Sequence, residues 1–364
     1  MSRRRDAVVV GGGPAGLAFA AAAAARGLDV TVLERREGPL DKACGEGLLP
    51  AGVRALAALD ALEAIDPLES SPFGELRWCE PGCSPARLAL PAPGGLGVRR
   101  TALVDALRSC AAAAGAELLT GAEVTGHART AGGIRAEVAG GEAVEARLLV
   151  AADGLASPTR RREGLERPVH GRPRFGIRRH FAVPPWAGAV EVHFGEGAEA
   201  YVTPAGPARI GVAILFEHEA RGRFEALLQR FPALDQLLDG AEPVPEARGA
   251  GPLERRAKAR VADRLVLLGD AAGYLDAVTG EGLSIAFGAA LDLAALLPAA
   301  LAAGAGPAAL APYEAAWARR YRAYAAWTRL VLLLSRHRAL RRQVLRLVTA
   351  RPQPFERVVA AAVG

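Results

Sequence analysis

The stretch Ala7-Val8-Val9-Val10-Gly11-Gly12-Gly13-Pro14-Ala15-Gly16 passes from four apolar residues into a glycine-rich turn. The apolar run predicts a buried parallel strand, and the alanine-rich sequence after it predicts a helix. Gly11, Gly13 and Gly16 have the G-x-G-x-x-G spacing of dinucleotide sites: the first allows a sharp turn, the second admits a pyrophosphate, and the third packs helix against strand. With Pro14 in its first turn, the helix presents free N–H groups to phosphates.

A second strand is predicted at 29–34, and it ends in the acidic residue Glu34. A carboxylate about 20 positions after the glycines commonly bonds a ribose 2′-hydroxyl. Because Glu34 would repel a 2′-phosphate, we expect the resident nucleotide to be FAD or NAD rather than NADP. Ala15 and Arg35, which adjoin these two motifs, are predicted to belong to the same site.

The composition indicates a large globular protein. A chain of 364 residues with 51% hydrophobic content is long enough for two domains. The four cysteines, at positions 44, 79, 83 and 110, are too few and too irregular for a disulfide framework or a zinc site, so we expect no metal and a reduced, cytoplasmic setting. The first strand begins so close to Met1 that no signal peptide is expected. His218-Glu219 lacks the second histidine of a zinc-protease motif.

The net charge of +6 does not indicate a nucleic-acid partner, since the basic residues are nearly all arginine, which is typical of a compositional bias. The longest apolar run, 287–303, is interrupted by Asp292 and Pro298, so we expect no transmembrane segment.

The apolar run 330–334 lies among arginines near the C-terminus. Its helices are expected to pack on the core or on a dimer partner, with contact to a membrane surface as the alternative. Monomer and homodimer both stay open.

The remaining pattern is that of an α/β protein. Helices are expected at 51–65, 98–115 and 221–231, and strands at 116–120 and 146–152, with a hairpin over 133–145. Residues 174–216 alternate and are rich in valine and aromatics, which predicts an antiparallel sheet, and 240–252 resembles a Pro/Gly-rich connector. A strand at 265–268 then runs into Gly269-Asp270, and the chain is mainly helical thereafter.

Gly269-Asp270 places a carboxylate at the carboxyl end of a strand, where α/β sheets bind ligands. An aspartate there can accept hydrogen bonds from ribityl or ribose hydroxyls. Gly280 and Gly282 then open a helix near Leu283, whose N–H groups can face the electron-rich N1–C2=O edge of a reduced flavin.

Three segments now stand in order: 11–16, Ala152-Asp153-Gly154 and 269–282. With them the chain resembles the p-hydroxybenzoate hydroxylase superfamily of FAD enzymes, and within it the geranylgeranyl-reductase-like branch. The resemblance implies a Rossmann-type, GR2-like FAD-binding domain (1–70, 98–170 and 258–300). It also implies a β-sheet substrate domain (71–97 and 171–257) and a C-terminal helical segment (301–364). FAD would bind tightly without a covalent bond, and NAD(P)H would bind only transiently.

The resemblance also assigns residues. Asp153 and Gly154 would lie near FAD and the nicotinamide route, and Arg100 would contact the cofactor, with Arg99 as a rival. The segment Cys44-Gly45-Glu46-Gly47 resembles one that passes beside the isoalloxazine in the reductase-like branch. Cys44 could tune the flavin, line the pocket, donate a proton, or be buried and inert.

Departures from the family keep the reaction open. Oxygenases usually have histidine where Gly273 stands, the family proline before Thr-Gly is Ala277, and the aromatic reductase segment is reduced to 201–204. The missing reductase aromatics favour a monooxygenase acting on a small hydrophobic, aromatic or polyketide-like substrate. The alternatives are a reductase of carbon–carbon double bonds in a prenyl substrate and a non-catalytic flavin-binding interaction protein. His193 and Tyr201 are candidate substrate contacts.

Overall fold

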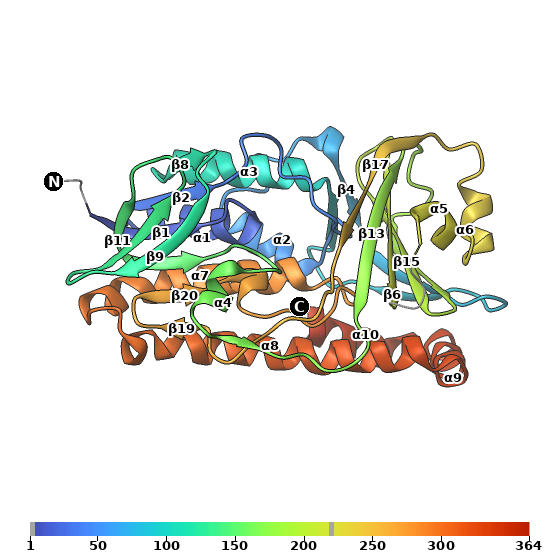
Figure 1. The fold of residues 1–364 in the computed structure, drawn as a ribbon. Coiled ribbons are helices and arrows are strands. Elements are labelled where there is room, and N and C mark those ends of the chain that lie inside the picture. Colours follow the sequence, from blue (N-terminus) through green and yellow to red (C-terminus); the bar gives the residue numbers. More distant parts are fainter. Residues whose placement is uncertain (1–3, 218–221, 364) are drawn as a thin grey trace.

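The computed structural model describes residues 4–217 and 222–363. His218-Glu219 and the start of the helix expected at 221–231 therefore lie outside the described residues. Two sheets stand side by side, and the long helix α8 (Pro307–Arg336) runs past both of them (Figure 1).

The first sheet is built around the opening strand. Its main path has the order β19-β20-β11-β1-β2-β8, and β1 pairs in parallel with both β2 and β11. Residues 7–10 are at most 8% exposed, which explains their continuous apolar run. The strands are β1 (Arg5–Val10), β2 (Val30–Glu34), β8 (Glu117–Thr120), β9 (Val124–Arg129), β10 (Ile134–Val138), β11 (Val144–Ala151), β19 (Val261–Ala262) and β20 (Leu265–Leu267).

Helices α1 (Pro14–Ala24), α3 (Arg100–Ala113) and α7 (Gly282–Ala302) pack with this sheet. Ten of the eleven residues of α1 are buried, and their small side chains let α1 contact both α3 and α7 closely. By length and composition α7 is the one helix in the described part of the chain that could cross a membrane, despite Asp292 and Pro298. Its apolar residues are largely buried against α1, α2 and α8, as in the core helix of a globular domain.

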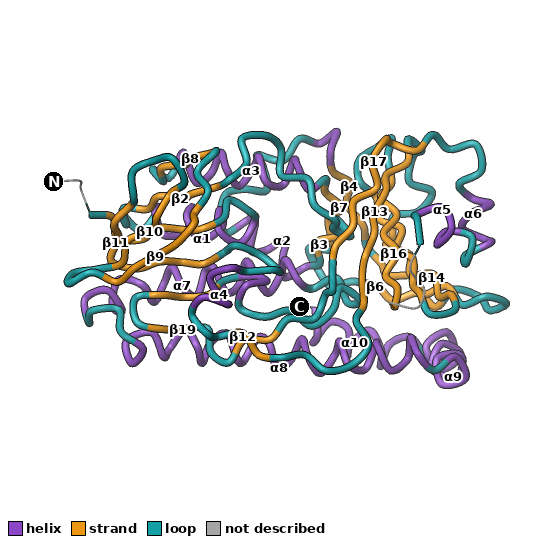
Figure 2. Tube along the Cα trace, in the orientation of Figure 1, coloured by secondary structure: helices purple, strands orange, loops and turns teal. Residues whose placement is uncertain are grey.

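The second sheet has the order β17-β13-β16-β15-β14-β5-β6. Its pairs are antiparallel, as expected, except that β14 and β5 run in parallel. Helices α5 (Phe224–Leu228) and α6 (Pro232–Leu237) cover its outer face (Figure 2). The strands are β5 (Glu75–Cys79), β6 (Ala86–Ala89), β13 (Arg174–Phe181), β14 (Ala189–Gly195), β15 (Ala198–Pro204), β16 (Ile210–Glu217) and β17 (Pro243–Ala250).

Two expectations about elements are wrong. The segment expected as a connector at 240–252 contains β17, which in the described part of the chain pairs with β13 alone and so forms an edge of the sheet. An edge is the position in a sheet where prolines are tolerated. Helix α2 (Pro50–Ala57) ends well before residue 65, because the chain turns at Asp60, which has a φ of +54°. How the two sheets divide into domains stays a prediction.

The smaller elements connect these layers. A three-stranded sheet has the order β3-β7-β4, and β12 pairs with β18. The remaining elements are β3 (Gly47–Leu48), β4 (Ser70–Phe73), β7 (Gly95–Val98), β12 (Glu166–Arg167), β18 (Arg256–Ala257), α4 (Pro158–Arg162), α9 (Arg338–Ala350), α10 (Pro352–Val363) and 3₁₀ turns at Pro67–Glu69 and Gly269–Ala271.

Candidate cofactor and substrate site

A cavity of about 260 Å³ lies between the carboxyl ends of the parallel strands and the inner face of the second sheet. Segments that are far apart in the sequence meet in its wall, as expected for a ligand site of an α/β fold. The site residues predicted from the sequence that line it are Gly13, Pro14, Ala15, Cys44, Gly45, Arg100, Gly154, Tyr201, Gly269, Asp270, Gly280, Gly282 and Leu283.

The three motif glycines are of two kinds: two are packed against the backbone, and one faces open space. Gly11 has a φ of +107°, and a Cβ there would lie 2.5 Å from the carbonyl oxygen of Ala152. A Cβ on Gly16 would lie 2.1 Å from the carbonyl oxygen of Gly11, so both positions exclude side chains for internal reasons. Gly13 differs, because a Cβ there would meet nothing within 4 Å and the residue lines the cavity. The open space beside Gly13, at the N-terminus of α1, fits a pyrophosphate.

Glu34 supports the glycine turn. Its carboxylate accepts hydrogen bonds from the backbone N–H groups of Gly12, at 2.8 Å, and Arg36, at 3.0 Å. Neither Glu34 nor Arg35 is among the cavity-lining residues, and Arg35 is exposed. Glu34 therefore holds the turn in shape, and its contact with a ribose stays a prediction.

Charged groups lie at the end of the cavity that contains Gly13 and Asp270, which we call the cofactor end. Burial raises the pKa of Asp270, although the positive charges of Arg100, Lys42 and Arg160 oppose that rise. The pKa of Lys42, which also lines the cavity, is lowered by burial and then by the nearby Arg100. The Nε of Arg100 is buried and has no hydrogen-bond partner among residues 4–217 and 222–363. A buried donor that finds no partner in the protein fits an anionic ligand such as the FAD diphosphate.

The segment after β11 is tied to the third motif by a residue that the sequence interpretation missed. The Arg160 side chain is fully buried, and its guanidinium donates to the carbonyl oxygens of Ala271, at 3.0 Å, and Leu155, at 2.9 Å. Oδ2 of Asp153 accepts a hydrogen bond from the N–H of Thr159 at 3.0 Å. The other carboxylate oxygen, Oδ1, is buried and has no partner among the described residues.

The sequence carries a signal for this arrangement. Ser157 caps helix α4 by accepting from the N–H of Arg160 at 2.9 Å, and a serine three positions before the third residue of a short helix is a recognisable N-cap. The serine therefore predicts a helix that begins at Pro158 and includes Arg160.

The Cys44–Gly47 segment is anchored by a second missed network. Glu46 has a φ of +58° and is buried, and its Oε1 accepts from the N–H of Arg100 at 2.9 Å. Its Oε2 lies 2.5 Å from Nε2 of His180, and Arg178 donates to Nδ1 of that ring at 3.1 Å. Cys44 lines the cavity, and its Sγ accepts a weak bond from the N–H of Glu46 at 3.4 Å. In the sequence, Arg178 and His180 stand two positions apart in β13 and so share one face of the strand, but this pattern does not identify Glu46 as their partner.

The other end of the cavity is apolar. It is lined by side chains of the second sheet and the C-terminal helices, chiefly Leu76, Trp78, Val190, Val192, Leu215, Trp327, Val331 and Val359. Tyr201 also lines the cavity, but its hydroxyl donates to the carbonyl oxygen of Val278 at 2.7 Å. Burial raises the pKa of Tyr201 well above its ordinary value, and the charge of Glu199 adds to the rise. Tyr201 is therefore a neutral wall of the site.

A buried ion group supports the chain at this wall. Arg174 pairs with Glu199 at 2.7 Å and with Asp276 at 2.9 Å. Asp276 also accepts from the N–H of Val278 at 3.0 Å, which fixes the segment leading to Gly280. Breaking such a buried group is costly, because each remaining charge would lose its partner.

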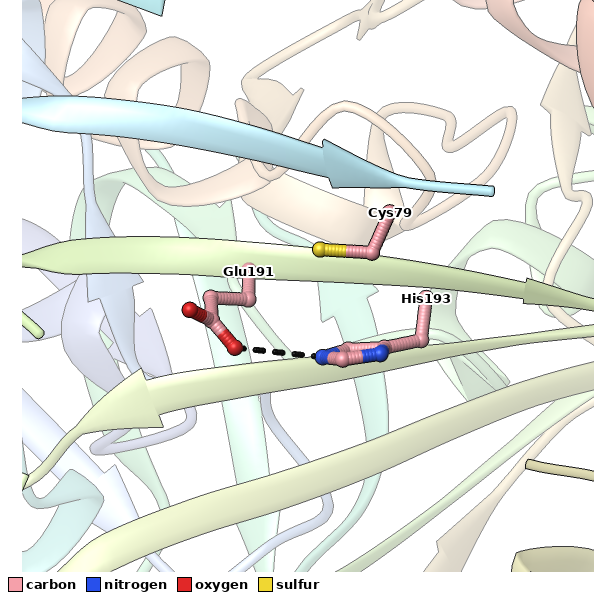
Figure 3. A group of neighbouring side chains, drawn as sticks. All are labelled: Cys79, Glu191 and His193. Carbon is pink, nitrogen blue, oxygen red and sulfur yellow. Dashed lines mark hydrogen bonds and ion pairs between the residues drawn. The ribbon is translucent and has the colours of Figure 1, made fainter. Parts of the chain in front are cut away.

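His193 does not reach the cavity. Side chains alternate along β14, so Val190 and Val192 face the cavity while His193 lies on the opposite face beside Glu191 and Cys79 (Figure 3). The expected substrate contact of His193 is therefore wrong.

The cluster of Cys79, Glu191 and His193 has its donor atoms within 4.8 Å of one another. However, Glu191 already accepts from Trp186 at 3.1 Å and from Arg77 at 3.4 Å. Burial, together with the charge of Glu191, raises the pKa of Cys79 to about 12, which favours the protonated thiol over a metal-binding thiolate. We interpret the cluster as a polar contact between β5 and β14.

Comparisons with known proteins agree with this geometry. The FAD binding domain family matches residues 4–328. Menaquinone reductase of Mycolicibacterium smegmatis is 31% identical over 313 residues, which cover 78% of this chain and 74% of that protein. Digeranylgeranylglycerophospholipid reductase 1 of Methanothermobacter thermautotrophicus is 28% identical over 300 residues, covering 76% of this chain and 73% of that protein.

Among solved structures, a flavoprotein/dehydrogenase from Cytophaga hutchinsonii superposes with a TM-score of 0.81 at 19% sequence identity. The match covers 90% of this chain and 86% of that chain and supports the fold. The resemblance to the p-hydroxybenzoate hydroxylase superfamily and its geranylgeranyl-reductase-like branch is thus confirmed. The chain belongs to the FAD binding domain family and is an FAD-dependent oxidoreductase.

Proposed function

We propose that the chain reduces a carbon–carbon double bond in a prenyl-type lipid, with NAD(P)H as the transient source of electrons. The observation that carries this proposal is the continuity of the cavity, which joins the polar cradle at Gly13, Arg100 and Asp270 to an apolar chamber. A long hydrocarbon chain suits such a chamber, because burying it there removes apolar surface from water.

The names of the two relatives also support a reductase. One is named for menaquinone and the other for a digeranylgeranyl phospholipid. Although the missing aromatic segment at 201–204 favours a monooxygenase, aromatic side chains from other parts of the chain, Trp78 and Trp327, line the same cavity as Tyr201. We therefore prefer the reductase and keep oxygenation as an outcome of the test.

The chain's own residues would act by binding, orientation and proton delivery. Arg100, Lys42 and the N-terminus of α1 would hold the FAD diphosphate, and Asp270 would accept from the ribityl hydroxyls. FAD, when bound and reduced, would supply a hydride, which carries two electrons and one of the two protons that the double bond gains. The apolar chamber excludes water from the reacting bond.

Reduction of a double bond also consumes a second proton, and we assign the delivery of this proton to Cys44. The Cys44 thiol lies in the cavity wall, where it can protonate one alkene carbon and recover its proton from solvent. A general acid contributes about 100-fold or more, so Cys44→Ala should slow substrate reduction by roughly that factor with its FAD content unchanged. Cys110→Ser, on helix α3 with its Sγ bonded to the carbonyl oxygen of Asp60, is the matched control. An unaltered rate in Cys44→Ala would show that Cys44 lines the cavity without delivering the proton.

The reaction is tested by supplying NAD(P)H and a detergent-solubilised geranylgeranyl lipid with and without oxygen. We expect a product heavier by two hydrogens under strict anaerobiosis. A hydroxylated or epoxidised product that forms only with oxygen would establish the monooxygenase instead. If the FAD-loaded protein transforms neither the lipid nor NAD(P)H, the proposed reductase reaction fails and a structural role of the cofactor becomes the alternative.

A further inference from the structure

The positive charge of the chain is concentrated at its C-terminus. Residues 329–364 hold eight arginines, no lysine and a single acidic residue, Glu356, which amounts to a formal charge of +7. The whole chain carries +6, so the preceding 328 residues are together close to neutral. A compositional bias toward arginine does not account for this asymmetry, because arginine is used throughout the chain.

Exposed apolar side chains gather on the same segment. Of the ten large apolar residues exposed in the described part of the chain, five lie on the end of α8, on α9 and on α10. They are between 39% and 59% exposed, and they are Leu330, Leu333, Leu340, Leu347 and Val358. The inner face of α9 is separate, since Leu345 and Val348 are buried. Both faces of α9 therefore carry apolar residues.

Part of the basic charge fastens these helices to the protein. Glu80 accepts from Arg338 at 2.9 Å, Arg341 at 2.7 Å and Arg342 at 3.1 Å, and its pKa is lowered because these guanidinium groups outweigh the effect of burial. Arg336 pairs with Glu217 at 3.0 Å.

Other arginines of the segment are not used in this way. The exposed side chains without an ion-pair partner among residues 4–217 and 222–363 are Arg329, Arg346, Arg351 and Arg357. Unpaired arginines interleaved with exposed leucines are typical of a face that lies in a membrane interface, where leucines enter the acyl boundary and arginines meet lipid phosphates.

We propose that this C-terminal surface, formed by the exposed residues of 329–358, docks on an anionic lipid bilayer. The charge favours a bilayer over a second copy of the chain, because a two-fold contact would bring the four unpaired arginines of one copy against the same four of the other. A nucleic acid would match the charge but would leave five apolar side chains against phosphates or water. An anionic bilayer satisfies both kinds of residue.

The docked face is continuous with the cavity wall. Trp327 and Val331 of α8 and Val359 of α10 line the apolar chamber, while Leu330 and Val358, their sequence neighbours, are exposed. Docking would therefore bring the chamber next to the lipid phase. That the docked protein draws its substrate from the bilayer rests on the proposed function, whereas the docking itself does not.

Docking is tested by sedimenting the FAD-loaded full chain with vesicles. We expect the wild type to bind vesicles that contain phosphatidylglycerol and to bind phosphatidylcholine vesicles much more weakly, with added salt weakening the first interaction. Each basic residue near an anionic surface strengthens binding about fivefold. The triple variant Arg346→Gln, Arg351→Gln, Arg357→Gln should therefore bind on the order of a hundredfold more weakly.

Matched controls separate this face from general charge and hydrophobicity. The variant Arg26→Gln, Arg161→Gln, Arg167→Gln removes three exposed arginines elsewhere and should bind like the wild type. Leu347→Ser, at a site 59% exposed, should weaken binding, whereas Leu237→Ser on α6, at a site 53% exposed, should not. Retained FAD absorbance shows that each variant is folded.

Two results would overturn the inference: equal binding to both kinds of vesicle, or equal loss in the two arginine variants. The surface would be assigned to a second copy of the chain by a different set of results: the wild type has the light-scattering mass of a dimer, Leu347→Ser has that of a monomer, and neither binds vesicles. If the protein does not bind vesicles but still reduces detergent-solubilised lipid, the docking proposal fails and the proposed function stands. Vesicle binding without reduction of the lipid would keep the docking surface and remove the proposed function.

Discussion

Two alanine substitutions in the same glycine motif should fail in different ways. Gly13 and Gly16 are three residues apart, yet a Cβ at 13 would meet nothing within 4 Å while one at 16 would lie 2.1 Å from a backbone oxygen. The first position faces the space that we assign to the FAD diphosphate. The second faces the turn itself.

The magnitudes follow from these environments. At Gly13, which is the N-cap of α1 with a φ of −76°, alanine is sterically allowed. The loss of cap preference, about 0.5–1 kcal/mol, is offset by a similar gain from restricting the unfolded chain, so apoprotein stability should change by less than about 1 kcal/mol. At Gly16 the Cβ must displace a backbone oxygen, and overpacking of this kind costs about 1–3 kcal/mol.

The assay is urea unfolding of each apoprotein together with fluorescence titration by FAD. We expect Gly13→Ala to unfold like the wild type and to bind FAD at least about tenfold more weakly, a loss of about 1.4 kcal/mol or more. Gly16→Ala should lose stability before any ligand is added. Wild-type FAD affinity in Gly13→Ala would refute the placement of the diphosphate, because the added methyl group would then occupy space that the cofactor does not use.

Other substitutions test the surrounding groups. Burial raises the pKa of Glu281 from 4.5 to about 7, so its contribution to stability is greatest below about pH 4.5 and is lost as the pH rises through 7. Relative to wild type, Glu281→Gln should gain up to about 3 kcal/mol between about pH 5 and pH 8 in apoprotein unfolding, and an identical pH dependence in the two proteins would contradict this. Tyr201→Phe leaves the Val278 carbonyl without its donor, so we expect a loss of about 1–2 kcal/mol in thermal stability and less than a tenfold change in kcat/KM. A larger loss of turnover at constant stability would give the Tyr201 hydroxyl a role in the reaction.

Local sequence determines the features that could be predicted. The opening strand and turn are specified within residues 7–16, where burial on both faces requires apolar residues and close approaches require glycine. Asp270 follows its strand directly, so its place at the carboxyl edge of the sheet follows from the strand alone. Thirteen of the proposed site residues line the cavity, and those of the opening turn and of the Asp270 motif do so because their strands end there.

The contacts that depend on how distant strands and segments align with one another could not be predicted from the sequence. Glu46 meets His180 only because β13 lies beside the Cys44–Gly47 segment, and no local pattern specifies that pairing. His193 illustrates the related error, because a strand prediction does not say which of its two faces meets the ligand, and a shift of one residue reverses every side chain. Arg160 was the recoverable case, since the Ser157 cap marks the start of its helix.

The central claim is that the glycine turn, the Asp153-Gly154 segment and the Asp270 motif converge on one FAD. A crystal structure of the purified protein with bound FAD tests it most directly. We expect the diphosphate beside Gly13 at the N-terminus of α1, hydrogen-bonded by Arg100, with a ribityl hydroxyl donating to Asp270. A flavin bound elsewhere, or a diphosphate distant from Gly13 and Arg100, would contradict the account.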